Sequence, residues 1–295
     1  MDKITVTGHT SIDYIFNIEN FPIENGSEKI QSINKYYGGG AANVSIGLSK
    51  LGNKVKLITP LGYDIYSTGY YQLLKSMDID ISESYIFKKE KLSRAFVFTN
   101  KNRSQMTYFY WGVGSKLSDI NLKKQDFVHI STADSNFNKR VSLNSNFVSF
   151  DPGQDLITYN KEDLEIILKN TDILFVNRYE LKLLCSILHK KFKDIKKWID
   201  PIIVTMDKFG SVLYTKNRVI HIPSIIKNVV DPTGAGDAYR SGFLTYYLKD
   251  YPLDICCKMG SIISSFVMES LGCQNNLPTL IQAEERYKLY FKEKL

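Results

Sequence analysis

Residues 231–248 read DPTGAGDAYRSGFLTYYL, a glycine-rich turn that leads into a helix predicted for Ala238–Leu248. Gly234 and Gly236 carry no Cβ, so backbone N–H groups of the turn can converge on an anion, and the positive end of the helix dipole adds to the attraction. Asp237 stands at the helix start, where it could accept a proton from an attacking hydroxyl. The same residue could equally be a simple N-cap. We therefore predict an anion-binding turn with an acidic group beside it.

Two common phosphate-binding motifs are missing from the chain. The glycine spacing does not fit the dinucleotide fingerprint, and there is no G-x-x-x-x-G-K-[ST] motif. The tetrapeptide NRYE at 177–180 follows an apolar strand predicted at Ile173–Val176, which places it at the sheet edge where open α/β proteins bind ligands. Asn177 and Glu180 could hold Mg²⁺ through water there, although a plain helix cap with a surface Glu explains the same residues.

Short β-rich apolar runs alternate with helical segments along most of the chain. This alternation predicts an α/β protein with a mostly parallel sheet and helices on its faces. Ala41–Leu51 has one apolar face and is followed by Gly52, so Gly38-Gly39-Gly40 should open a helix. The predicted strands are Ile4–Thr7, Lys54–Thr59, Phe127–Ser131, Phe147–Phe150, Ile173–Val176 and Ile202–Thr205.

The stretches 14–37 and 85–111 do not fit this alternation. They resemble strands broken by turns, and we predict that they form a small β lid inserted into the α/β body. Both faces of the last lid strand carry large side chains that need cover. Either a partner subunit that packs on the lid or an ordinary core position of the strand would bury them. Those faces carry Met106, Tyr108 and Tyr110 on one side and Thr107, Phe109 and Trp111 on the other.

Composition favours one folded enzyme-sized body, which we expect to be a single domain over 1–295. The 295 residues are 43% hydrophobic and 23% charged, unlike disordered chains. The net charge of +7 comes from dispersed lysines, so no nucleic-acid partner is expected. Four cysteines without a C-x-x-C pair indicate neither zinc nor disulfides. No signal-peptide pattern or membrane-length apolar run is seen, so we expect a cytoplasmic protein with no membrane partner.

Four motifs in order resemble those of the ribokinase-like PfkB carbohydrate and nucleoside kinases. They are GHTSID at 8–13, GGGAAN at 38–43, NRYE at 177–180 and DPTGAGD at 231–237. The archaeal nucleoside-kinase branch is the most similar, through YYGG at 36–39, VSFDPGQD at 148–155 and GCQNNLP at 272–278. The resemblance implies a three-layer α/β/α body with a small β lid, an ATP- and Mg²⁺-dependent kinase, and a homodimer formed through the lid.

The resemblance also implies a role for each motif. Asp237 would be the catalytic base, and the N–H groups of Gly234, Ala235 and Gly236 would stabilise the transferring phosphoryl group. The vicinal ribose hydroxyls would be bound by Asp13, Gly39 and Asn43. ATP would lie along Asn177, Thr205, Gly210 and Asn275. The metal ligands would be Glu180 for Mg²⁺, through water, and Asp231 and Thr233 for a monovalent cation such as K⁺.

The predicted donor loop departs from the family pattern at one position. The family usually reads T-x-G-x-x-G, whereas residues 205–210 here read TMDKFG. Asp207 therefore brings a side chain and a negative charge towards the nucleotide, which puts donor affinity and donor identity in question. Asp207 and Lys208 could neutralise each other locally.

The resemblance to the archaeal nucleoside kinases implies a nucleoside substrate of the inosine, guanosine or cytidine type, phosphorylated on its 5′-hydroxyl. Phe109, Tyr110 or Trp111 could stack on the base, at a benefit of about 1–3 kcal/mol by analogy with single-strand binders. Gln154 could bind the base edge or a sugar hydroxyl.

Two alternatives remain open at this point. A sugar kinase, such as a ribokinase, fructokinase or ATP-dependent 6-phosphofructokinase, is the first, because Arg94 and Arg103 could bind a sugar phosphate. A non-catalytic nucleoside or sugar sensor is the second. Asp237 with its glycines argues against the sensor, because a binding protein has no need of a base.

Overall fold

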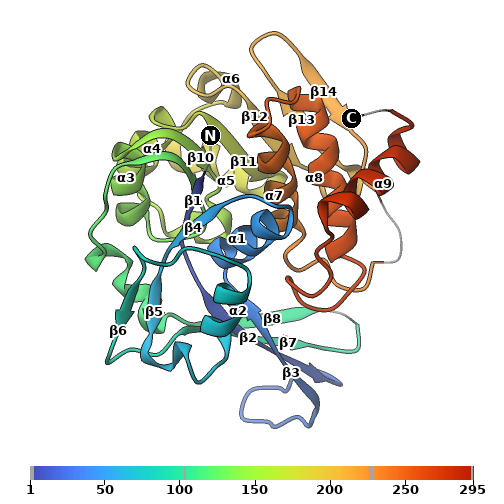
Figure 1. Cartoon of the computed structure of the whole chain (residues 1–295). Coiled ribbons are helices and arrows are strands. Elements are labelled where there is room, and N and C mark those ends of the chain that lie inside the picture. The colour runs from blue at the N-terminus through green and yellow to red at the C-terminus, as the bar shows by residue number, and fades with distance from the viewer. Residues whose placement is uncertain (1–2, 103, 226–228, 294) are drawn as a thin grey trace.

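The computed structural model describes residues 3–102, 104–225, 229–293 and 295, and its centre is an eight-stranded sheet (Figure 1). All neighbouring strands are parallel except in the β12–β13 and β13–β14 pairs, which are antiparallel. In spatial order the strands are β14 (Val219–Ile222), β13 (Ser211–Tyr214), β12 (Ile202–Thr205), β11 (Ile173–Asn177), β10 (Ser145–Phe150), β9 (Gln125–Ile130), β1 (Ile4–Thr7) and β4 (Val55–Ile58).

Helices cover both faces of this sheet and make a three-layer body (Figure 1). One face carries α1 (Gly40–Lys50), α7 (Ala235–Tyr247), α8 (Leu253–Val267) and α9 (Leu280–Phe291). The other carries α3 (Ser135–Leu143), α4 (Lys161–Lys169) and α5 (Arg178–Leu188). The shorter segments are α2 (Tyr70–Ser76), α6 (Phe192–Ile195), η1 (Tyr63–Ile65), η2 (Gly112–Asp119), η3 (Gly153–Thr158) and η4 (Asp207–Phe209).

Period-two alternation along the central strands supplies a separate core for each face. In β11, Ile173 and Phe175 join the buried cluster that contains α7 and α8 residues, whereas Leu174 and Val176 join the cluster that contains α3, α4 and α5 residues. This explains why the strands read as continuous apolar runs in the sequence. The predicted fold class and all six predicted strands are confirmed, with ends that shift by at most two residues.

Helix α7 begins at Ala235, three residues before the predicted start. Gly234 is its N-cap and adopts the left-handed conformation, with φ 79°. Asp237 is therefore the third residue of the first turn, and the interpretation of Asp237 as an N-cap is wrong. A Cβ on Gly234 would lie 2.6 Å from the Cβ of Cys273, so both conformation and space require glycine here.

A separate four-stranded sheet, here called the small sheet, lies beside the body with the order β3-β2-β7-β8 (Figure 1). Its strands are β2 (Ser11–Ile18), β3 (Ile30–Gly38), β7 (Ser93–Thr99) and β8 (Gln105–Tyr110). The predicted lid boundaries were partly wrong. The small sheet already begins at Ser11, and β6 (Tyr85–Phe87) pairs instead with β5 (Pro60–Gly62) in a two-stranded sheet.

The strand β8 is not a core strand within one chain. Met106, Tyr108 and Tyr110 are 45%, 60% and 46% exposed, and Trp111 just beyond the strand is 39% exposed. Only Phe109 on β8 is half-buried. The interpretation of this strand as an ordinary core element is therefore wrong, and one face of the small sheet remains apolar and open. Among the described helices, none is both long enough and apolar enough to cross a bilayer.

Candidate active site

A cavity of about 710 Å³ gathers the carboxyl ends of the parallel strands, the starts of α1 and α7, and part of the small sheet. This is the edge at which open α/β sheets bind ligands. Of the fifteen site residues predicted from the sequence, all except Asp231 and Asn275 line it. Asn275 lines a smaller cavity of about 250 Å³ instead, and its amide donates to the Leu271 carbonyl at 2.8 Å. The structure thus does not bring Asn275 together with the predicted donor residues.

The glycine turn is held in shape by Asp231, which lies beneath it and is 6% exposed. Its Oδ1 accepts from the backbone N–H of Thr233 at 3.0 Å and from the Thr233 hydroxyl at 2.6 Å. Its Oδ2 accepts from the N–H of Gly272 at 3.2 Å, which fastens the turn to the loop that carries Cys273.

The N–H groups that face an anion at this turn are not all the predicted ones. The N–H of Ala235 donates to the Pro232 carbonyl at 3.1 Å. The first-turn N–H groups of a helix have no partner within the helix, so we expect those of Gly236 and Asp237 to meet an anion, and the role of the Gly234 N–H stays a prediction.

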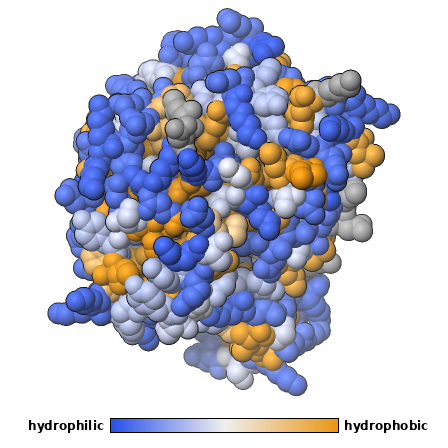
Figure 2. Space-filling view, in the orientation of Figure 1, coloured by the Kyte–Doolittle hydropathy of each residue, from blue (hydrophilic) through white to orange (hydrophobic). Residues whose placement is uncertain are grey.

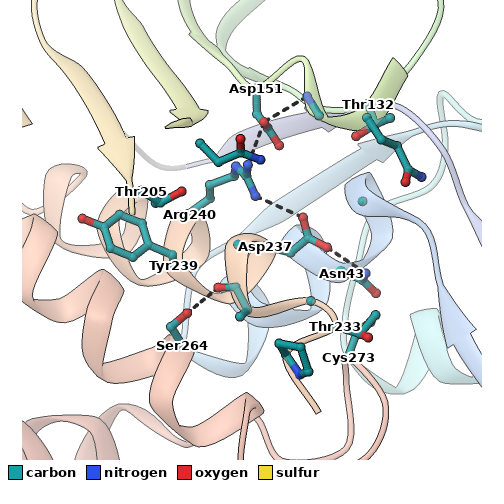
Figure 3. Close-up of a pocket in the computed structure, with 18 of the residues that line it drawn as sticks. Asn43, Thr132, Asp151, Thr205, Thr233, Asp237, Tyr239, Arg240, Ser264 and Cys273 are labelled. Atoms are coloured by element: carbon teal, nitrogen blue, oxygen red, sulfur yellow. Dashed lines mark hydrogen bonds and ion pairs between the residues drawn. The ribbon is translucent and has the colours of Figure 1, made fainter. Parts of the chain in front are cut away.

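Asp237 faces the cavity, and a neighbouring side chain contacts each of its two carboxylate oxygens (Figure 3). Its Oδ2 accepts from Asn43 Nδ2 at 2.9 Å, and its Oδ1 lies 3.4 Å from a guanidinium nitrogen of Arg240. Burial raises the pKa of Asp237, while Arg240 and Asn43 oppose that rise. The result is a fixed, desolvated carboxylate, as a general base requires.

A chain of hydrogen bonds fixes the orientation of the Asn43 amide. Gln274 Nε2 donates to Asn43 Oδ1 at 2.8 Å and to the Tyr70 hydroxyl at 3.0 Å. The Tyr70 hydroxyl in turn donates to the Gly38 carbonyl at 2.8 Å. Asn43 must therefore present its NH₂ group to Asp237. The sequence analysis missed Gln274, although it stands inside the quoted motif GCQNNLP.

Asp13, the third residue of β2, lines the same cavity. The Ser11 hydroxyl donates to its Oδ1 at 2.7 Å. Burial raises the pKa of Asp13 to about 6, against the effect of Ser11, and the negative charge of Asp237 adds to the rise. Gly39, the N-cap of α1 with φ 96°, lines the cavity close by.

Asn177 and Glu180 form a capping box at the start of α5. Asn177 Oδ1 accepts from the N–H groups of Tyr179 and Glu180 at 2.8 and 2.9 Å, and Glu180 Oε2 accepts from the Asn177 N–H at 2.7 Å. The helix-cap interpretation is therefore correct, but both side chains also line the cavity. The second oxygen of Glu180 is free of this cap and can bind an ion through water, as Mg²⁺ prefers. No group of three or more His, Cys, Asp and Glu poised for a metal occurs among the residues described.

Asp207 is paired differently from the prediction. Its carboxylate lies 2.9 Å from the guanidinium of Arg178, which also stacks on the Tyr179 ring at 4.7 Å. Lys208 instead lies over the ring of Phe209, at 5.4 Å. The expected neutralisation by Lys208 is wrong, because Arg178 at the start of α5 reaches across from the neighbouring strand end. Asp207 and Lys208 both line the cavity, together with Thr205 and Gly210.

The opposite end of the cavity is aromatic and polar. Phe109 lines it, whereas Tyr110 and Trp111, the two other proposed stacking residues, do not. His9 packs edge-on against Phe109 and lies 3.1 Å from Asp155, and Gln154 lines the cavity beside them.

Arg94, one of the two arginines that kept a sugar phosphate in consideration, does not line this cavity. Arg94 is bound by Asp64 at 2.5 Å and by the Leu92 carbonyl at 3.1 Å, and it is not part of the lining. Arg103 lies outside the described residues.

Asp151 and Arg240 are charged cavity residues that the sequence analysis missed. Asp151 follows β10 directly, and Arg240 lies one helical turn after Asp237. Asp151 was in the quoted segment VSFDPGQD, and the spacing of three between Asp237 and Arg240 was a signal that the two side chains share a helix face.

Comparisons with known proteins agree with this geometry. The profile of the pfkB family carbohydrate kinases matches residues 1–280. A nucleoside kinase of Methanocaldococcus jannaschii is 44% identical over 97% of this chain and 97% of its own, and one of Methanothermobacter thermautotrophicus is 37% identical over 96% and 95%.

Solved structures give the same picture. The Methanocaldococcus jannaschii nucleoside kinase, described as an archaeal member of the ribokinase family, superposes with a TM-score of 0.95 over 98% of this chain and 99% of that one, at 44% identity. The Burkholderia thailandensis nucleoside kinase in complex with inosine superposes with a TM-score of 0.90 over 99% and 100%, at 21% identity, and supports the fold alone.

Proposed function

This chain belongs to the pfkB family of carbohydrate kinases, and we propose that it transfers the γ-phosphoryl group of ATP to the 5′-hydroxyl of a nucleoside. It is a phosphotransferase that acts on a hydroxyl group, as its family and its nucleoside-kinase relatives indicate. One observation carries the proposal: Asp237 lies beside a helix N-terminus in a large cavity, held by Asn43, with its carboxylate facing the open space.

The proposed reaction uses these groups in one step. The substrate hydroxyl gives its proton to Asp237 while its oxygen attacks the γ-phosphorus, and the bond from that phosphorus to the bridging oxygen breaks to release ADP. Negative charge on the transferring group would meet the N–H groups of Gly236 and Asp237 and the positive end of the α7 dipole. Asp13 and Asn43 would hold the ribose diol, since a carboxylate and an amide can accept from and donate to it.

Several features favour a nucleoside over a sugar phosphate. Phe109 offers a ring at the end of the cavity where Gln154 and Asp155 offer polar groups for a base edge. Of the two arginines predicted to bind a sugar phosphate, Arg94 is the one that the structure describes, and it is already bound by Asp64. The two relatives at 44% and 37% identity are nucleoside kinases, whereas a deoxyribokinase that also matches 97% of the chain is only 25% identical. Inosine, guanosine and cytidine are the nucleosides we propose to test first.

The second carboxylate oxygen of Glu180, which takes no part in the helix cap, is the candidate ligand for Mg²⁺. Mg²⁺ bound there through water and to the donor phosphates would neutralise phosphate charge. For a monovalent cation, Asp231 and Thr233 are the candidates. The Asp231 carboxylate accepts three hydrogen bonds and so retains one lone-pair position. Activity in KCl compared with equal choline chloride tests this site.

We further propose a homodimer through the small sheet, in a cytosolic enzyme. The open face of β8 carries Met106, Tyr108 and Tyr110, and such patches usually mark interfaces. The face in view mixes hydrophilic and hydrophobic residues, and one of its hydrophobic groups lies at the lower end, where the small sheet lies (Figure 2). All four cysteines are free thiols, as in a reducing compartment. Closure of the small sheet over the cavity would exclude water during transfer.

An ADP-release assay over nucleosides, ribose, fructose and fructose 6-phosphate tests the function. We expect turnover with nucleosides, a 5′-monophosphate product in ³¹P NMR, and loss of turnover in Asp237→Asn. Asp172→Asn is the matched control, because Asp172 accepts from the Val148 N–H at 2.7 Å outside the cavity lining, and Asn can accept the same bond. Turnover with fructose 6-phosphate alone would refute the substrate, and full activity of Asp237→Asn would refute the mechanism.

A further inference from the structure

Arg240 is a buried cation at the centre of the site (Figure 3). Its side chain is 11% exposed and lies between two carboxylates, 2.7 Å from Asp151 and 3.4 Å from Asp237. A third carboxylate, Glu180, acts on it electrostatically. Asp151 itself is 1% exposed and is the closer partner. The distances are unequal, and this inequality is the observation on which the inference rests.

A buried general base has two conflicting requirements. It must stay ionised, although removal from water favours the neutral acid. It must also remain basic enough to take a proton, which a tight ion pair with arginine would prevent. Arg240 meets both requirements. It lies 3.4 Å from Asp237 and is bound more closely by Asp151, so its charge stabilises the Asp237 carboxylate without a short hydrogen bond to that carboxylate.

The same arrangement keeps charge balanced during the reaction. When Asp237 takes a proton from the substrate, it becomes neutral and no longer compensates Arg240. Asp151 still does, at 2.7 Å, so no unpaired cation is left in the site. Without Asp151, protonation of Asp237 would leave the guanidinium with only the more distant Glu180.

We propose that Arg240 is a positioning residue for the base Asp237. Asp151 binds the Arg240 guanidinium and so prevents a tight ion pair with Asp237, which therefore stays ionised yet able to accept the hydroxyl proton. This inference rests on the proposed role of Asp237 as the base. It assigns a purpose to two charged residues that neither phosphate binding nor ribose binding requires.

Other groups also face Asp237 and bear on its titration. Asn43 on α1 donates to it, and Asp13 on β2 and the Cys273 thiol each interact with it electrostatically. The charges that act most strongly on Arg240 are those of Asp151, Asp237 and Glu180, and burial raises the pKa of Asp151 itself to about 7 although Arg240 opposes that rise. Substitutions at Arg240 and Asp151 therefore test the arginine pair separately from the remaining charges.

The test is the pH profile of kcat at saturating nucleoside in three variants, because protonation of Asp13 would act on the nucleoside KM. Arg240→Met should move the acid limb to higher pH by about one unit or more, since an opposite charge within about 4–6 Å lowers a carboxyl pKa by about 1–3 units. Asp151→Asn should move it to lower pH and also reduce kcat, because Arg240 is then free to pair tightly with Asp237. Arg240→Lys should fall between wild type and Arg240→Met.

The control is Arg286→Met. Arg286 is 12% exposed and pairs with Glu269 at 3.1 Å, and neither residue belongs to the cavity lining. It should lower the melting temperature and leave the acid limb unmoved. If Arg240→Met does not fold, the isosteric Asp151→Asn variant carries the test alone.

The inference would be overturned, while the kinase proposal stands, if the acid limb moved in the same direction in Arg240→Met and Asp151→Asn. It would also be overturned if the acid limb did not move in Asp151→Asn. A wild-type protein inactive towards every hydroxyl substrate would instead overturn the proposed function, and this inference with it.

Discussion

Replacement of Gly38 by alanine should disable Asp13 while the chain still folds. A Cβ on Gly38 would lie 2.0 Å from Asp13 Oδ2 and 2.5 Å from its Cγ, and the three nearest atoms all belong to that side chain. Gly38 is not among the glycines with positive φ, so alanine suits its backbone. The new methyl group therefore conflicts with one carboxylate and with no backbone atom among its three nearest neighbours.

The size of the effect follows from the distance. A carbon and an oxygen come no closer than about 3.3 Å, so the carboxylate must move by about 1.3 Å. A misplacement of about 1 Å in a catalytic site can cost about 10²-fold in rate. We expect nucleoside kcat/KM to fall by about 10²-fold, about 2.7 kcal/mol, while the KM for ATP changes by less than about twofold.

Steady-state ADP release with varied nucleoside measures this loss, and a double-mutant cycle isolates its cause. In an Asp13→Ala background, the added Gly38→Ala change should have little effect, because the group it displaces is gone. Equal losses from Gly38→Ala in both backgrounds would refute the reasoning, as would a Gly38→Ala enzyme with wild-type kcat/KM.

Protonation of Asp13, whose pKa burial raises to about 6, should weaken substrate binding in mildly acidic solution. Nucleoside KM should therefore rise as pH falls below about 6, and Asp13→Asn should remove that dependence; a wild-type KM constant between roughly pH 5 and roughly pH 8 would contradict this. Arg178→Gln should raise the KM for ATP, most at low ionic strength, because Asp207 then faces the phosphates unpaired. Adding Asp207→Gly should restore it, and an unchanged KM in Arg178→Gln would count against the donor placement. Tyr108→Lys should sediment as a monomer where wild type sediments as a dimer, and a wild-type monomer at working concentration would eliminate the proposed interface.

The sequence could predict what depends on local pattern. Alternating strands and helices fixed the α/β class, because buried parallel strands must read as apolar runs such as ILFV at 173–176. The glycine turn could also be predicted, since few residues other than glycine adopt the left-handed backbone conformation that Gly234 has.

Long-range charge pairing could not be predicted in this way. Arg240 and Asp151 are distant in the sequence, and only the parallel packing of β10 against its neighbours brings the end of that strand to α7. The Arg178–Asp207 pair likewise depends on the adjacency of β11 and β12. The open apolar face of β8 was ambiguous, because alternation shows that a face needs cover but not whether the same chain supplies it.

The most direct measurement of the central claim is the single-turnover rate of phosphoryl transfer in Asp237→Asn, by rapid quench with ATP and nucleoside saturating. Asparagine keeps the shape of the residue and can still accept from Asn43, but it cannot take the hydroxyl proton. We predict a transfer rate lower by about 10²–10⁴-fold, with the nucleoside Kd within about threefold of wild type. A rate within about tenfold of wild type would contradict the role of Asp237 as the base.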